Sequence, residues 1–221
     1  MKSRLPFPIL HEDRDVIVVD KPAGMLTTKT RAKETNTAEE WLNDYVRKGQ
    51  AKSRKHVWLV HRLDRETSGV MMFAKSESVA ETFRANWNEL TEKTYVARVE
   101  GELAEERGAF ESYLQEDADG YKVRSVPVPS KPSKLSKPPK LSRTEWRKIL
   151  VEDGTTLVEV TLKSGRKNQI RVHFSEAGHP VVGDEKYGGQ RASRLYLHSM
   201  KLRFRHPHDG KWMEFTSKED L

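Results

Sequence analysis

The sequence predicts an α+β protein in which a mixed, largely antiparallel sheet is flanked by helices. Short apolar runs typical of strands, such as Val16–Val19, recur along the chain. Two segments with the apolar spacing of amphipathic helices, 37–48 and 78–90, lie between such runs in the first half. No internal repeat or domain linker is visible, so we expect one domain spanning residues 1–221.

The first half contains most of the recognisable elements. Thr37 with Glu40, and Ser78 with Glu81, form the capping-box pattern that starts a helix. The predicted elements are, in order, a strand at 15–20, a helix at 37–48, strands at 57–60 and 70–74, a helix at 78–90 and a strand at 95–99.

The second half is expected to consist mainly of strands and turns, with strands at 144–150 and 157–162. Residues 168–177 fit a strand or a helix, and Asn168 as a start signal with Gly178 as a stop signal favours the helix. Residues 127–143 contain five prolines, four lysines and four serines, which predicts an exposed, partly extended insertion loop.

The charge distribution points to a nucleic acid partner. The net charge is +7, from 40 basic and 33 acidic residues. The segment 120–144 holds seven basic and no acidic residues, so it carries the whole excess. A basic segment on a neutral body is typical of proteins that contact RNA or DNA phosphates.

The composition also excludes several classes. The chain has no cysteine, which excludes disulfides, a thiol nucleophile and cysteine-ligated zinc. No apolar run is long enough to span a bilayer, and the N-terminus lacks the apolar core of a signal peptide. A cytoplasmic protein without a membrane partner is therefore expected.

The segment His61–Gly69 is the strongest candidate for a site. It places Asp64 between Arg62 and Arg65 and just before a Thr-Ser-Gly turn. A carboxylate among fixed positive charges stays ionised and can act as a nucleophile or a general base. Judged by charge alone, such a cluster is more often a surface ion pair.

The whole segment resembles the central motif of the RluA-like pseudouridine synthases. Further segments resemble other motifs of that family in the family's order, and together they cover roughly residues 10 to 217. These segments are Val19–Met25, Lys93–Gly101, Ser164–His173 with its continuation Gly183–Gly188, and Leu195–Pro207.

The resemblance implies a long bent sheet with an active-site cleft across it, and an isomerisation of uridine in RNA without a cofactor or a metal. Asp64 matches the family's catalytic aspartate, which either attacks C1′ or removes a proton from C2′. Arg171 matches the arginine that pairs with this aspartate. Tyr95 matches the family's active-site tyrosine, whose ring is expected to stack on the uracil and whose hydroxyl is a candidate for handling the C5 proton; the alternative is a strand tyrosine packed in the core.

The resemblance also implies residues that contact RNA. Arg62 matches a residue that enters the space left by a flipped base, the alternative being a surface ion pair to Asp64 or Glu66. His61 either contacts RNA or buttresses the loop, and Ile170 packs beside the base or in the core. Arg166 and Lys167 lie in a polar turn that can hold a phosphate before a helix.

The expected partner is structured RNA, ribosomal or transfer, bound by a monomer that needs no nucleotide cofactor. Many family members carry an S4-type RNA-binding domain, which is not expected here. Asn168 stands where the family usually has histidine. Two other functions remain as alternatives: a non-catalytic RNA-binding or RNA-folding protein, and a hydrolase of glycosidic bonds, for which Glu66 is the nearest second carboxylate.

Overall fold

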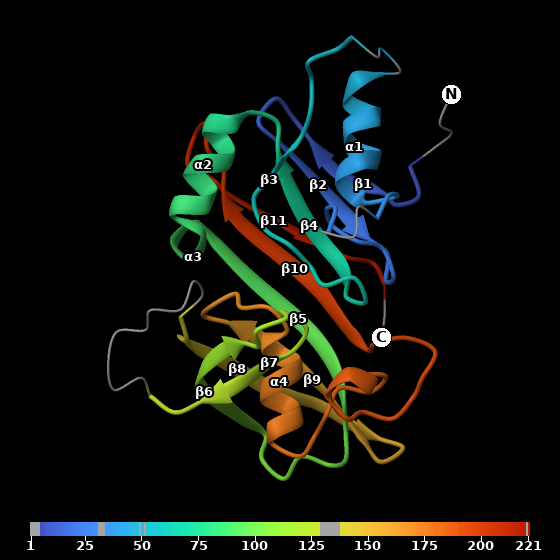
Figure 1. Ribbon diagram of the computed structural model, residues 1–221, viewed down its shortest axis with the longest axis vertical. Coiled ribbons are helices and arrows are strands. Elements are labelled where there is room, and N and C mark those ends of the chain that lie inside the picture. Colours follow the sequence, from blue (N-terminus) through green and yellow to red (C-terminus); the bar gives the residue numbers. More distant parts are fainter. Residues whose placement is uncertain (1–4, 31–33, 49, 51, 129–137, 220) are drawn as a thin grey trace. The chain divides into compact units, whose positions relative to one another are not determined.

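The computed structural model describes residues 5–30, 34–48, 50, 52–128, 138–219 and 221. The chain forms two compact units (Figure 1). The first contains Met1–Lys93 and His198–Asp220, and the second contains Thr94–Leu197 with Leu221. Most of the predicted loop at 127–143, including Lys131, Lys134 and Lys137, lies outside the described residues.

The sheet of the first unit contains both parallel and antiparallel pairs. Strand β2 pairs antiparallel with β1 and β4, β3 pairs antiparallel with β4, and β10 pairs antiparallel with β11. Strand β10 runs parallel to β4 where the two first meet. The strands are β1 Ile9–Glu12, β2 Val16–Lys21, β3 Trp58–Leu59, β4 Ser68–Ala74, β10 Leu197–Arg205 and β11 Trp212–Thr216.

The helices of the first unit bury apolar stripes. Helix α1, Ala38–Arg47, begins at the predicted capping box of Thr37 and Glu40. Helix α2, Glu77–Ala85, places Phe83 in a buried cluster with side chains of β2, β4 and β10. Burying such side chains provides most of the energy that holds a helix on a sheet.

The prediction of one helix at 78–90 is wrong in two respects. The cap is Ser76, whose hydroxyl accepts from the amide of Val79, and the helix is interrupted at Asn86 before the short α3, Trp87–Leu90. The side chain of Asn86 donates to the carbonyl of Thr82 at 3.1 Å. An asparagine that bonds the preceding turn in this way competes with the helical backbone.

The second unit contains an antiparallel sheet in the order β5-β9-β8-β6-β7. The predicted helix after Asn168 is confirmed as α4. The elements are β5 Thr91–Glu100, β6 Arg107–Glu116, β7 Val123–Val126, β8 Lys140–Glu152, β9 Thr155–Leu162, α4 Gln169–Glu176 and the 3-10 helix η1 Glu185–Tyr187.

The predicted loop extends too far at its C-terminal end. Strand β8 starts at Lys140, and its first residues pair with β6, with Ser142 opposite Ser112. Ser142 and Thr144 are buried and alternate with exposed residues, as a half-buried strand requires. Their small polar side chains gave no apolar signal in the sequence.

The predicted α+β class, with a mixed and largely antiparallel sheet and flanking helices, is confirmed. Within the described residues, no helix combines the length and the apolar character that crossing a bilayer requires.

Candidate active site

The loop that carries Asp64 is held by backbone bonds on both sides of that residue. On the N-terminal side, the buried hydroxyl of Thr27 donates to the carbonyl of Leu63 at 2.9 Å and accepts from its amide at 3.3 Å. The carbonyl of Asp64 itself accepts from the amide of Thr67 at 3.2 Å. The side chain of Asp64 is half-buried. The loop therefore presents a carboxylate on a fixed backbone.

On the C-terminal side, the loop is fastened by a buried lysine. The ammonium of Lys21 donates to the carbonyls of Pro22, Met25 and Arg65 at 2.9, 2.8 and 3.3 Å. The carbonyl of Arg65 also accepts from the amide of Gly24 at 2.8 Å. The Lys-Pro-Ala-Gly turn thus acts as a brace for the Asp64 loop, a role that the sequence analysis did not assign. A lysine ending an apolar strand was the only signal.

Gly69 ends the motif at a point where the backbone of β10 comes very close. Ser68 and Gly69 pair in parallel with His198 and Ser199. Gly69 has φ +113°, and a Cβ built there would lie 2.3 Å from the carbonyl oxygen of Ser199. The hydroxyl of Ser68 bonds to Nδ1 of the buried His198 at 2.7 Å. Only glycine fits between these two paired strands without displacing the backbone of one of them.

His61 makes contacts that correspond to the buttressing alternative. Its Nε2 accepts from the amide of Met72 at 3.1 Å, so Nδ1 carries the proton, and its ring stacks on Trp87 with centroids 4.5 Å apart. Desolvation and the nearby ammonium of Lys93 lower the pKa of His61 to about 3. Burial also lowers the pKa of Lys93 to about 8. A neutral His61 therefore joins the loop to β4.

Arg62 differs from the other basic residues of the motif. Its side chain is exposed, and in the described part of the chain its guanidinium has no hydrogen-bond or ion-pair partner. Among the described residues no bond joins Arg62 to Asp64 or Glu66, so the alternative of a surface ion pair gains no support there. Arg65, in contrast, forms an ion pair with Glu34.

Arg171 is held rigidly in the second unit. It lies on α4 with 4% of its surface exposed, and Nε and Nη2 each donate to one carboxylate oxygen of Asp184 at 2.7 Å. Asp184 is 1% exposed, and the guanidinium also lies 5.3 Å from the ring centroid of Tyr187. A two-pronged bond of this kind fixes the plane of the guanidinium. Asp184 is a positioning residue that the sequence analysis missed, although it follows Gly183 in a matched segment.

The other predicted residues of the second unit differ in exposure. Tyr95 on β5 and Ile170 on α4 are buried. Arg166 is exposed, whereas the ammonium of Lys167 forms an ion pair with Glu116 at 2.8 Å. Lys167 therefore has an internal partner, and Arg166 is the more accessible of the two cations in this turn.

The polar turn before α4 is organised from inside the protein. The buried side chain of Gln169 accepts from the hydroxyl of Ser164 at 2.8 Å and from the amide of Arg166 at 3.1 Å. Asn168 has φ +52° and makes no side-chain cap; its oxygen accepts instead from Lys186 and from the hydroxyl of Tyr187, each at 3.1 Å. The hydroxyl of Ser164 and the amide of Arg166, two donors of this turn, are thus already bonded to Gln169.

Among the described residues, two clusters in the first unit have the side chains that a metal ion needs. They are Asp13 with Asp15 and His206, and Asp20 with His198 and Glu219. Asp13 already accepts from ring nitrogens of His206 at 3.0 Å and of His11 at 2.7 Å. Hydrogen bonding therefore accounts for the first cluster.

The family follows from comparison with known proteins. A family model described as RNA pseudouridylate synthase matches residues 15–176, which include the Asp64 loop, Tyr95 and Arg171. The chain belongs to this family. The resemblance to RluA-like enzymes is confirmed, and the synthase is an isomerase of uridine in RNA. The two alternatives, a protein without activity and a hydrolase, are thereby set aside.

Alignments with similar proteins extend over nearly the whole length of this synthase. The dual-specificity RNA pseudouridine synthase RluA of Yersinia pestis is 32% identical over 221 residues, which are 96% of this chain and 99% of that protein. The tRNA pseudouridine synthase C of Vibrio cholerae is 34% identical over 224 residues, covering 90% and 86%. The solved human RNA pseudouridylate synthase domain containing 1 shares the fold, with a TM-score of 0.72, 24% identity and coverage of 99% and 86%.

Proposed function

We propose that this synthase converts uridine to pseudouridine in ribosomal or transfer RNA, with Asp64 as the catalytic carboxylate acting on a flipped-out nucleotide. The names of the Yersinia and Vibrio relatives support an RNA substrate. The observation that carries the role of Asp64 is its loop, in which the residues before and after it are fastened by Thr27 and Lys21. Catalysis depends on holding a reacting group in place before the substrate arrives.

The reaction sets the demands on these residues. The N1–C1′ bond breaks, the freed uracil rotates, C5 joins C1′, and a proton leaves C5. Asp64 either attacks C1′, as the nucleophile of a retaining glycosidase does, or removes a proton from C2′. Both routes need an ionised carboxylate. Because the reaction is an isomerisation without redox change, we propose that it proceeds without a metal or a nucleotide cofactor.

We further propose that Arg171 and Tyr95 act on the same uridine. Asp184 holds the Arg171 guanidinium by two bonds of 2.7 Å, so its charge has a fixed direction. Its proposed role is to keep the catalytic carboxylate ionised. Tyr95 is proposed to stack on the uracil and to handle the C5 proton, and Ile170 to pack beside the base.

Arg62 is proposed to enter the space that the flipped uridine leaves. Flipping costs a few kcal/mol of unstacking, and a planar guanidinium can recover part of this by stacking and by contacting phosphate. Its exposure and its lack of a partner in the described part of the chain support this role. We also propose that the synthase acts as a monomer in the cytoplasm, with Arg166 among the residues that contact RNA.

The test is to map pseudouridines in total RNA incubated with wild-type protein, Asp64→Asn or Glu66→Gln. Asp64→Asn should abolish the signal at every site that wild-type protein modifies, while circular dichroism and the melting temperature show a folded protein. Glu66→Gln is the matched control, because it removes an exposed carboxylate from the same loop, and it should retain activity. Appreciable turnover by folded Asp64→Asn would refute the assignment.

A further inference from the structure

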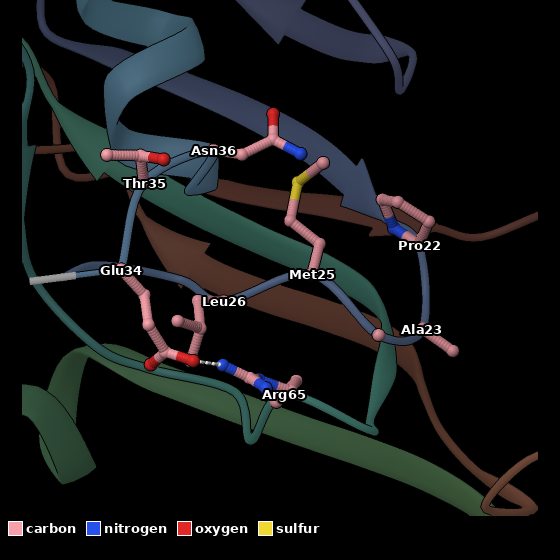
Figure 2. A pocket seen from close by; sticks show the side chains of 9 residues that line it. Pro22, Ala23, Met25, Leu26, Glu34, Thr35, Asn36 and Arg65 are labelled. Carbon is pink, nitrogen blue, oxygen red and sulfur yellow. Dashed lines mark hydrogen bonds and ion pairs between the residues drawn. The ribbon is translucent and has the colours of Figure 1, made fainter. Parts of the chain in front are cut away.

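A pocket of about 610 Å³ lies beside the Asp64 loop in the first unit (Figure 2). It is lined by residues 22–26, residues 34–36 and Arg65. Pockets that bind small ligands and nucleotides have volumes of about 300 to 1,000 Å³. Because Arg65 follows Asp64 in the chain, their Cα atoms are about 3.8 Å apart. Whatever occupies this pocket therefore lies next to the catalytic loop.

The walls combine apolar surface with a few polar groups. Pro22, Met25 and Leu26 contribute the apolar surface. In Figure 2 the Met25 side chain and the Asn36 amide extend towards each other on one side, and the Glu34–Arg65 ion pair lies on the other. The oxygen of Asn36 accepts from the indole N–H of Trp41 at 2.5 Å, which fixes the amide and leaves its two N–H groups as donors.

This combination fits a nucleobase. Unpaired bases in RNA are recognised by stacking on aromatic rings or guanidinium planes, by packing between apolar side chains, and by hydrogen bonds to their edges. A uridine that leaves its stack also exposes the base next to it, and that base needs a new surface. Resting on the proposed function, we propose that this pocket takes the base of a nucleotide flanking the reacting uridine and thereby sets the sequence preference of the synthase.

The polar groups also indicate which bases fit best. The bond from Arg65 lowers the pKa of Glu34, followed by the bond from Thr30, so Glu34 is a carboxylate acceptor at neutral pH. A carboxylate accepts from the exocyclic amino groups of adenine, cytosine and guanine, which uracil lacks. The pocket should therefore prefer one of these three bases to uracil.

The probe is a synthetic RNA hairpin that copies the site most strongly modified by wild-type protein in total RNA. The nucleotides 5′ and 3′ of the target uridine are each changed to the other bases and to an abasic residue, and kcat/KM is measured. The variants are Met25→Ala and Asn36→Asp. Asn36→Asp keeps the acceptor for Trp41 and tolerates the φ of +74° at this position, but removes the amide donors.

Asn43→Asp is the matched control. It makes the same substitution on α1 outside the pocket, where the asparagine oxygen also accepts one bond, from the amide of Val57 at 2.8 Å. At one flanking position, wild-type protein should prefer the best base to the abasic residue by about 10-fold or more, the scale of one pocket contact. Met25→Ala and Asn36→Asp should shrink this ratio at that position alone, and Asn43→Asp should leave it unchanged.

The inference is overturned if wild-type protein uses abasic and complete hairpins equally at both flanks. It is also overturned if the pocket variants lower kcat/KM by one common factor on all hairpins, because that result means loop damage rather than base recognition. Failure of the proposed function looks different: no RNA then carries pseudouridine that depends on wild-type protein, and both proposals fall.

Discussion

Replacing Gly69 with alanine should destabilise the first unit and disable the Asp64 loop together. The new Cβ would lie 2.3 Å from the carbonyl oxygen of Ser199 and 2.7 Å from its carbonyl carbon. Real Cβ atoms do not approach backbone so closely, so either β4 or β10 must shift. Gly69 also has φ +113°, where an L-residue is strained.

The size of the effect can be worked out by comparison with Gly210. That residue also has a positive φ, +69°, but a Cβ there meets nothing within 4 Å. Gly210→Ala therefore carries only the backbone cost, about 1 to 2 kcal/mol. Gly69→Ala adds the displacement of packed backbone, about 1 to 3 kcal/mol more. A total of about 2 to 5 kcal/mol is a large share of the 5 to 15 kcal/mol typical of whole proteins.

The assay is equilibrium unfolding in urea for wild type, Gly69→Ala and Gly210→Ala, followed by kcat at a temperature where all three are folded. Gly69→Ala should lose more free energy of unfolding than Gly210→Ala. Its kcat should also be lower than that of wild type, by more than any loss of folded protein explains. Equal losses for the two variants would mean that the close approach to Ser199 does not constrain the strand. An unchanged kcat would mean that the close approach of β4 and β10 does not control the position of the Asp64 loop.

Three further predictions concern the residues that hold the site. Lys21→Met removes charged bonds worth about 1.5 to 3 kcal/mol, so stability to urea and kcat should both fall; full activity would argue against the brace. Asp184→Asn breaks a buried ion pair, so the free energy of unfolding should fall by about 3 kcal/mol. The kcat should fall by a larger factor than KM changes, and an unchanged kcat would make Arg171 a structural residue. The folded pKa of His61, about 3, lies below its usual 6.5, so its contribution to stability is full above pH 6.5 and is lost as the pH falls towards 3. Between pH 7 and 4, wild type should lose more unfolding free energy than His61→Gln, and parallel curves would contradict the assigned shift.

Local patterns in the sequence were sufficient for much of the fold. The apolar run at 16–19 predicted β2, and the capping box of Thr37 and Glu40 predicted the start of α1, because both signals are read from neighbouring residues. The break at Asn86 depends on a competing side-chain bond to Thr82. The early start of β8 depends on pairing with β6, which a window of sequence cannot contain.

In the candidate site, the residues proposed to react were easier to predict from the sequence than the residues that position them. Asp64 was prominent through its charged neighbours. Lys21 was not, because its partner in the loop is the carbonyl of Arg65, 44 residues away, and a carbonyl has no signature in sequence. Asp184 stands 13 residues from Arg171, just before η1, and only the fold brings the two together.

These contacts distinguish two roles of the positively charged residues, which a count of charges does not separate. Lys21, Arg171 and Lys167 bond to carbonyls or carboxylates inside their own unit, and Arg65 bonds to Glu34. Such cations are ordered before RNA arrives, so binding costs little side-chain entropy at those positions. The guanidinium of Arg62 has no such partner in the described residues and loses its rotamer freedom only on binding. That cost is acceptable for a residue whose proposed place, the gap in the RNA stack, exists only after the uridine has flipped.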